Sequence, residues 1–117
     1  MGEVGVSELD LRRERAARNE NLFREVNERI EDLATTASFT QFICECYDDT
    51  CDQRVSMTVQ EYEEVRADGN RFFVLPGHTA DDVDEVLEEN DRYLIVRKIG
   101  AGAAVAESLD PRNRENS

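Results

Sequence analysis

The chain contains few of the residues that mark several classes of protein. Among its 117 residues are three cysteines, one histidine, two prolines and no tryptophan. An odd number of cysteines leaves one thiol over in any disulfide framework, and residues 1–6 have neither a basic start nor a long apolar run. A secreted, disulfide-bonded domain is therefore not expected. No apolar run reaches the roughly 18 residues of a membrane-spanning helix. We predict a cytoplasmic protein that does not enter the membrane.

Basic residues are also scarce. The 14 Lys and Arg residues stand against 27 Asp and Glu residues, for a net charge of −13. Affinity for nucleic acid depends on neutralising phosphates with Lys and Arg, so direct binding to DNA or RNA is not expected. A surface this acidic instead favours a protein partner with a basic surface, such as part of the transcription or signalling machinery.

The few cysteines are concentrated in one segment. Cys44, Cys46 and Cys51 lie within eight residues of each other, and the one histidine, His78, follows Pro76-Gly77. Three thiolates and one imidazole form one of the standard ligand sets of a structural zinc site. We predict that these four residues bind one Zn²⁺ ion.

The spacing of the four residues fits this prediction. Side chains alternate along an extended segment, so Cys44 and Cys46 share a face and Glu45 points to the opposite one. The turn-forming residues 47–50 can reverse the chain and return Cys51 to the pair. A rigid proline followed by a permissive glycine can direct His78 inward.

Other interpretations of the same residues stay open. The cysteines could be small buried hydrophobic residues, with His78 on the surface. An iron–sulfur cluster could use the same ligands. The Cys-x-Cys followed by Cys51-Asp52 resembles the NEET-type pattern in part, but that pattern continues with glycine and keeps its histidine close by. A catalytic zinc would need an open coordination position, and zinc-bound thiolates could also serve a redox sensor.

The first part of the chain predicts a long helix over residues 7–35. Ser7 is a candidate N-cap, with Asp10 at the capping-box position, and no glycine or proline interrupts the segment. An apolar stripe recurs at helical spacing and is predicted to pack on the core, or to pair with a second copy in a homodimer or with a partner helix. The stripe consists of Phe23, Val26, Ile30 and Leu33.

The remaining patterns predict an α+β fold in which zinc stabilises an antiparallel or mixed sheet of about four strands with two short helices. Strands are expected at residues 40–46, 54–57, 71–75 and 93–99. Helices are expected to begin after Thr58 and after Thr79. The predicted organisation is a flexible N-terminus, a helix, a zinc-binding domain and a flexible acidic or polar tail, at residues 1–6, 7–35, 36–100 and 101–117.

The order of the motifs resembles a group of short bacterial proteins, common in high-GC Gram-positive genomes. The resemblance covers residues 11–99 and is carried by Arg-Asn-Glu-x-Leu-Phe-Arg-Glu-Val-Asn-Glu-Arg-Ile at 18–30, Cys-Glu-Cys at 44–46, Cys51, Glu-Tyr-Glu-x-Val-Arg at 61–66, Phe72 or Phe73, Pro-Gly-His at 76–78 and Tyr93. It implies the same four ligand types but no reaction or partner. The sequence as a whole predicts a non-enzymatic, zinc-stabilised protein-interaction or regulatory module.

Overall fold

Ser7 begins the long N-terminal helix, as predicted. Its Oγ accepts a hydrogen bond from the backbone N–H of Asp10 (3.0 Å), and helix α1 spans Glu8–Leu33. The computed structural model describes residues 7–34 and 39–112, which form three helices and five strands and confirm the α+β class. The flexible segments predicted at 1–6 and 113–117 lie outside the described residues. Within the described ranges, no helix is long and apolar enough to cross a membrane.

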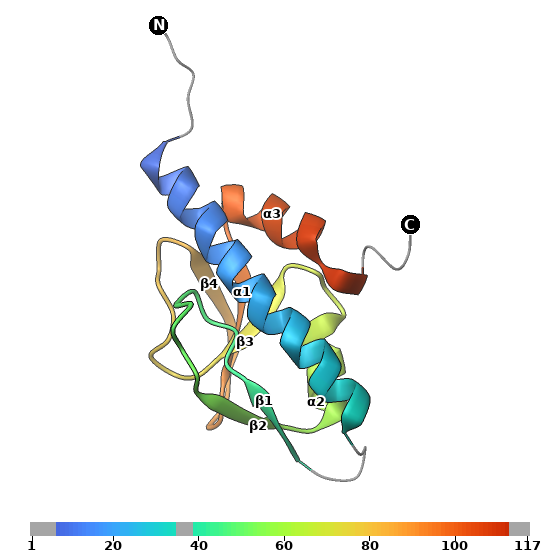
Figure 1. The fold of residues 1–117 in the computed structure, drawn as a ribbon. Coiled ribbons are helices and arrows are strands. Elements are labelled where there is room, and N and C mark those ends of the chain that lie inside the picture. The colour runs from blue at the N-terminus through green and yellow to red at the C-terminus, as the bar shows by residue number, and fades with distance from the viewer. Residues whose placement is uncertain (1–6, 35–38, 113–117) are drawn as a thin grey trace, which may run out of the picture.

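The strands form a hairpin and a three-stranded sheet (Figure 1). β1 (Thr40–Ile43) pairs antiparallel with β2 (Arg54–Met57). In the second sheet β5 (Leu94–Lys98) lies between β3 (Arg71–Val74) and β4 (Asp84–Glu89), and both pairings are antiparallel. β5 is thereby hydrogen-bonded along both of its edges, and Val96 and Lys98 face the core while Arg97 is exposed.

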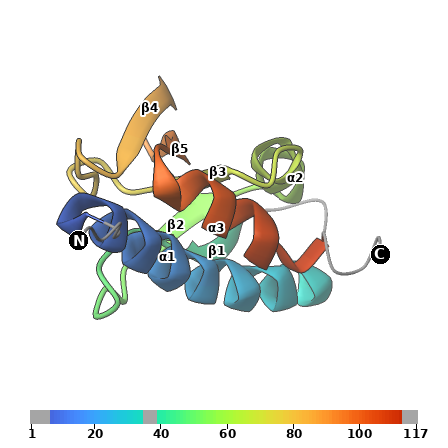
Figure 2. The same cartoon turned by 90° about the horizontal axis from the view of Figure 1, so that it is seen from above.

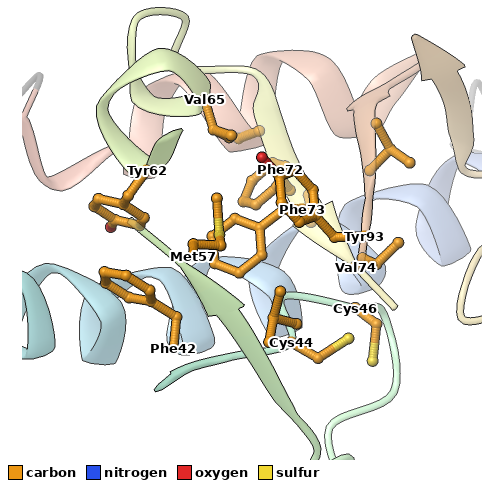
Figure 3. Packing of buried hydrophobic residues seen from close by; sticks show 14 residues of the cluster. Phe42, Cys44, Cys46, Met57, Tyr62, Val65, Phe72, Phe73, Val74 and Tyr93 are labelled. Carbon is orange, nitrogen blue, oxygen red and sulfur yellow. The ribbon is translucent and has the colours of Figure 1, made fainter. Parts of the chain in front are cut away.

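Aromatic side chains join the hairpin to the larger sheet (Figure 3). The ring of Phe42 on β1 stacks on Tyr62 at 4.6 Å between centroids, and Phe73 on β3 meets both rings edge-on at about 6 Å. Tyr62 belongs to α2 (Val59–Arg66), which begins at Thr58 with the predicted capping box. Cys44 and Cys46 belong to the same buried cluster, so the thiols lie at the edge of the core.

The helix predicted to begin after Thr79 is wrong. Residues 84–89 are strand β4, with Glu85 opposite Arg97 and Val86 opposite Val96 on β5. Acidic residues have weak intrinsic preference for strands, so the local sequence favoured a helix. Pairing with β5 decides the outcome, assisted by a cross-strand ion pair between Glu85 and Arg97 (2.5 Å).

The flexible tail predicted from residue 101 is also wrong over its first part. Helix α3 (Ala101–Leu109) lies beside α1 on one side of the strands (Figure 2). A Cβ atom placed on Gly102 would lie 2.8 Å from the carbonyl oxygen of Arg13, so the small residues let the two helices approach closely. After α3, Arg112 donates from Nε to the carboxylate of Glu28 on α1 (2.8 Å).

Helix α1 turns mainly polar side chains toward the core, and only part of the predicted apolar stripe packs there. Ile30 packs against the core and Phe23 is half-buried, but Val26 and Leu33 are exposed. The buried side chains of the helix are Ala16, Ala17, Glu20, Asn21, Arg24 and Asn27. Hydrophobic periodicity therefore indicated only the edge of the buried face, because hydrogen bonds and ion pairs hold most of this face on the sheet.

Two groups of contacts carry this polar packing. Arg24 donates to the carbonyl oxygens of Gly69 (2.7 Å) and Ala106 (2.8 Å), and its guanidinium lies 4.4 Å from the centroid of Phe72. Lys98 lies between two carboxylates, with Nζ 2.9 Å from Glu20 and 2.6 Å from Asp84. All three side chains of this acid–lysine–acid group are fully buried.

Replacing Lys98 with methionine should strongly destabilise the domain. The substitution keeps the volume but leaves Glu20 and Asp84 buried without a counter-charge, which costs about 3–5 kcal/mol. Burial already raises the pKa of Glu20 well above its ordinary value. The loss should grow as the pH rises, because the folded variant must then ionise two buried carboxyl groups. Urea unfolding at several pH values measures it. The matched change at exposed Arg54 should cost less than about 0.5 kcal/mol, and equal losses would contradict this account.

Candidate metal centre

The four predicted ligands come from two connections that are distant in sequence. Cys44, Cys46 and Cys51 belong to the link between β1 and β2, whereas His78 belongs to the link between β3 and β4. The first connection crosses to the larger sheet at Glu45, whose backbone N–H donates to the carbonyl oxygen of Phe73 (3.0 Å). The two connections therefore lie together where the hairpin meets β3.

Backbone hydrogen bonds fix the position of the Cys44 thiol. The N–H of Cys44 donates to the carbonyl oxygen of Gln53 (3.0 Å), which continues the hairpin beyond β1. Its Sγ accepts from the backbone N–H of Leu75 (3.3 Å). A hydrogen bond to sulfur favours the charged thiolate, which is the form that binds a metal. The end of β3 thus supports a sulfur ligand as well as leading to the imidazole.

The turn after Cys46 returns the chain as predicted. Asp48 Oδ1 accepts from the backbone N–H of Thr50 (2.9 Å) and from its hydroxyl (2.7 Å). The carbonyl oxygen of Asp48 then accepts from the N–H of Cys51 (3.0 Å). These local bonds are typical of an aspartate-initiated turn, and they bring the third thiol back to the first two.

The Pro76-Gly77 turn places the imidazole. The N–H of His78 donates to the carbonyl oxygen of Leu75 (3.0 Å), and Gly77 has a φ of 87°. Proline followed by a residue with positive φ is typical of a type II turn, and glycine is favoured at the second of these positions. The turn directs Nδ1 of His78 toward the thiols.

Two separations between ligand atoms match those around a single tetrahedral ion, and the other ligand atoms lie close by. Nδ1 of His78 lies 3.6 Å from Sγ of Cys44 and 3.7 Å from Sγ of Cys51. All four ligand atoms, including Sγ of Cys46, lie within 4.8 Å of one another. Tetrahedral bonds of about 2.3 Å to sulfur and about 2.0–2.1 Å to nitrogen place sulfur and nitrogen about 3.6 Å apart. The structure therefore confirms that the predicted residues form a Cys₃His group able to hold a metal ion.

The three thiols differ in pKa. A hydrogen bond from Cys44 lowers the pKa of Cys46 to about 5, and the bond to Cys46 together with burial raises the pKa of Cys44. Burial also raises the pKa of Cys51. A bound divalent ion would displace the remaining protons, because metals bind the thiolate form.

Two supporting residues were not recognised from the sequence. The Glu45 carboxylate points away from the thiols, as the alternation predicted, and accepts from Nδ2 of Asn27 on α1 (2.8 Å). Asn27 also bonds both backbone groups of Ile43, accepting from its N–H (2.8 Å) and donating to its carbonyl oxygen (2.8 Å). Because Glu45 lies between two predicted ligands and was expected to point away from them, its carboxylate was a signal that a hydrogen-bond partner was needed on the opposite side. Nothing in the local sequence identifies Asn27 as that partner.

The surroundings of the group are partly open to solvent. A hollow of about 190 Å³ lies beside it, lined by Cys46, Tyr47, Asp48, Gly77 and His78. Cys44 and Cys46 are buried, whereas Cys51 and His78 are half-buried. An ion here would have core atoms on one side and the two turns on the other.

Comparison with protein-family models, with curated proteins and with solved structures gave no match. The fold and the site therefore define the class on their own: a small α+β domain with a Cys₃His group that can bind a metal. The resemblance to short bacterial proteins stays a prediction.

Replacing His78 with alanine should weaken metal binding, whereas replacing it with cysteine should not. Alanine leaves three ligands, and the affinity should fall by more than roughly a hundredfold, since loss of a supporting residue alone costs 10–100-fold. Cysteine restores a four-ligand Cys₄ set, which is also standard for zinc. Competition with a chromogenic chelator measures both affinities. A His78→Ala protein that binds as tightly as wild type would show that the imidazole is not a ligand.

Proposed function

We propose that this chain is a zinc-stabilised, non-enzymatic protein-interaction module. The observation that carries the proposal is the convergence of three thiols and one imidazole within 4.8 Å at the junction of the two sheets. Zinc bound by four protein ligands has no open coordination position, which is the mark of a structural and not a catalytic site. The ion would fix the β1–β2 connection against the turn that carries His78.

Zinc fits this ligand set better than an iron–sulfur cluster does. In a two-iron cluster each iron takes two protein ligands, and the bridging sulfides hold the two pairs apart. Here Nδ1 of His78 is within 3.7 Å of both Cys44 and Cys51, a separation typical of ligands that share one ion.

The carboxylates nearest to the site give little support to catalysis. Glu45 is buried in the β1–β2 connection, where it accepts from Asn27. Asp48 uses Oδ1 to hold the turn at Thr50. A general base must reach the proton that it removes, and Glu45 is held away from the site by Asn27. Asp48 lines the hollow beside the group, so the closed four-ligand set, and not the carboxylates, carries the argument against catalysis.

The acidic surface is the first candidate for a docking site. Four glutamates and one asparagine surround a hollow of about 250 Å³ whose remaining lining residues are Tyr93 and Ile95. Glu61 already pairs with Arg92 (2.6 Å), so a partner with arginine or lysine side chains would meet the charges of Glu64, Glu88 and Glu89. The polar residues that line the hollow, apart from Tyr93, are Glu61, Glu64, Glu88, Glu89 and Asn90.

A thiol-based sensor is the second candidate, and the exposure of Cys51 favours it. This thiol is half-buried, whereas Cys44 and Cys46 are buried. With peroxide as oxidant, Cys46 and Cys51 would lose two electrons and form a disulfide, and the peroxide would be reduced to water. The ion would then lose two of its ligands.

Purified protein should contain one zinc per chain and show no visible absorption. Removing the ion with a chelator should lower the melting temperature markedly, since the free energy of binding a structural zinc is also free energy of folding. Elemental analysis, an absorption spectrum and a thermal melt make the three measurements. Visible charge-transfer bands with stoichiometric iron, or a melt that does not respond to the chelator, would contradict the proposal.

Neutralising the acidic hollow should weaken binding to a basic probe. A labelled arginine-rich peptide should bind the Glu88→Gln, Glu89→Gln double variant roughly threefold to tenfold more weakly than wild type at low salt, because each exposed charge contributes up to about 1 kcal/mol. Fluorescence anisotropy provides the dissociation constants. The matched control, Glu8→Gln with Asp32→Asn, removes two charges from α1. An equal loss in that control would mean that net charge, and not the hollow, attracts the peptide.

A further inference from the structure

The segment that follows α3 binds to two other helices through one arginine. Arg112 donates from Nε to Glu28 on α1 (2.8 Å) and from Nη1 and Nη2 to Glu63 on α2 (3.0 and 2.5 Å). Its Nη2 also donates to Glu31 on α1 (3.2 Å). Two N–H groups directed at one carboxylate form the paired geometry that a guanidinium favours. Glu28, Glu31 and Glu63, which we call the glutamate trio, thus bind a guanidinium of the chain itself.

A buried arginine holds the start of the same segment. Arg66 on α2, whose side chain is fully buried, donates from Nη2 to Asp110 and from Nε to Glu28 (3.2 Å). Its remaining nitrogen, Nη1, has no hydrogen-bond partner among the described residues. A buried donor of this kind has lost its bond to water without gaining another. Arg66 can therefore bind one more acceptor atom than Asp110 supplies.

Negative charge exceeds positive charge in this cluster. Four carboxyl groups, from the glutamate trio and Asp110, contact the two guanidinium groups of Arg66 and Arg112. Burial and a hydrogen bond with Glu63 raise the pKa of Glu31 to about 8, so Glu31 holds a proton near neutral pH. The chain's own cations thus leave part of the negative charge to be neutralised by a proton.

The segment has the form of a short peptide ligand. Its two charged side chains, Asp110 and Arg112, stand two residues apart and bind the two halves of the cluster at once. The backbone N–H of Arg112 donates to Oδ1 of Asp110 (3.0 Å), and Pro111 restricts the backbone between them. The segment is therefore held in one conformation, which lowers the entropy that binding costs.

We propose that Arg66 and the glutamate trio form a docking site for a partner segment with a carboxylate and an arginine two residues apart, and that residues 110–112 block this site within the chain. The partner's arginine would take the place of Arg112 on the trio. Its carboxylate has two oxygens, so it can accept from both Nη1 and Nη2 of Arg66. A tethered segment competes at an effective concentration in the millimolar range, so a partner binds only when that segment leaves.

This site goes beyond the proposed function. It contains no metal ligand and no residue that lines the acidic hollow. It also selects a different partner, because a basic peptide matches the hollow, whereas Arg66 requires a carboxylate as well. Zinc content and peptide binding to the hollow can therefore succeed or fail independently of this site.

A charge-neutral change in the chain's own segment tests the proposal. Asp110→Asn with Arg112→Gln removes one acid and one base, so the net charge is kept while the site is released. A labelled, end-blocked peptide with the sequence of residues 107–112, Glu-Ser-Leu-Asp-Pro-Arg, should bind the zinc-loaded double variant at least roughly tenfold more tightly than wild type, since the tethered competitor is lost. The matched control, Asp52→Asn with Arg54→Gln, changes two exposed residues at the same spacing and should bind the peptide as weakly as wild type.

Fluorescence anisotropy measures the binding, and circular dichroism checks the fold of both variants. Replacing the aspartate of the peptide with asparagine, or its arginine with glutamine, should remove most of the gain in affinity. Equal affinity for wild type and the released variant, or binding to neither at millimolar peptide, would overturn the proposal and leave residues 110–112 as a structural clamp.

The single variant Arg112→Gln gives a second measurement if the double variant does not fold, because it keeps the bond between Asp110 and Arg66. Methylguanidinium at roughly three times its dissociation constant should refill the trio and raise the melting temperature of this variant by about 2–5 °C. Methylammonium, which lacks the paired N–H groups, should raise it less. Wild type, whose trio is occupied, should respond equally to both ions. A variant that does not distinguish the two ions would also overturn the proposal.

Discussion

The convergence of three thiols and one imidazole is the constraint on which the arrangement of this domain depends. The ligands come from two connections separated by the whole of β2, α2 and β3. The buried sulfurs of Cys44 and Cys46 have hydrogen-bond partners of their own, in the backbone N–H of Leu75 and the carbonyl oxygen of Asp48. With an ion, each ligand gains a bond stronger than any hydrogen bond that the core supplies. An ion bound here would join the hairpin to the larger sheet beside the hydrogen bonds that Glu45 makes with Phe73.

The polar face of α1 complements this constraint from the other side of the hairpin. Asn27 bonds to both backbone groups of Ile43 and to the carboxylate of Glu45, so the helix holds the segment that carries the first two thiols. Further along the helix, Glu20 and Lys98 form a buried ion pair. Buried polar contacts are sensitive to geometry, and they fix the helix in one position more strictly than apolar packing alone would. Several large apolar side chains of α1, among them Leu22, Val26 and Leu33, are in consequence exposed.

Local signals in the sequence predicted the site better than the fold. The ligand set was predictable because Cys44, Cys46, Cys51 and His78 have few alternative roles, and because turn chemistry at Asp48 and Pro76-Gly77 is local. The strand at residues 84–89 was not predictable in this way, because its pairing with β5 overrides a weak strand preference. The burial of the polar side of α1 depends on partners 16 to 82 residues away, which no periodicity contains.

X-ray absorption at the zinc edge tests the central claim most directly, because it reports the number, type and distance of the metal's neighbours. The account predicts a single zinc with three sulfur neighbours at about 2.3 Å and one nitrogen neighbour at about 2.0–2.1 Å. Scattering from a second metal, or a first shell with fewer than three sulfurs, would contradict it.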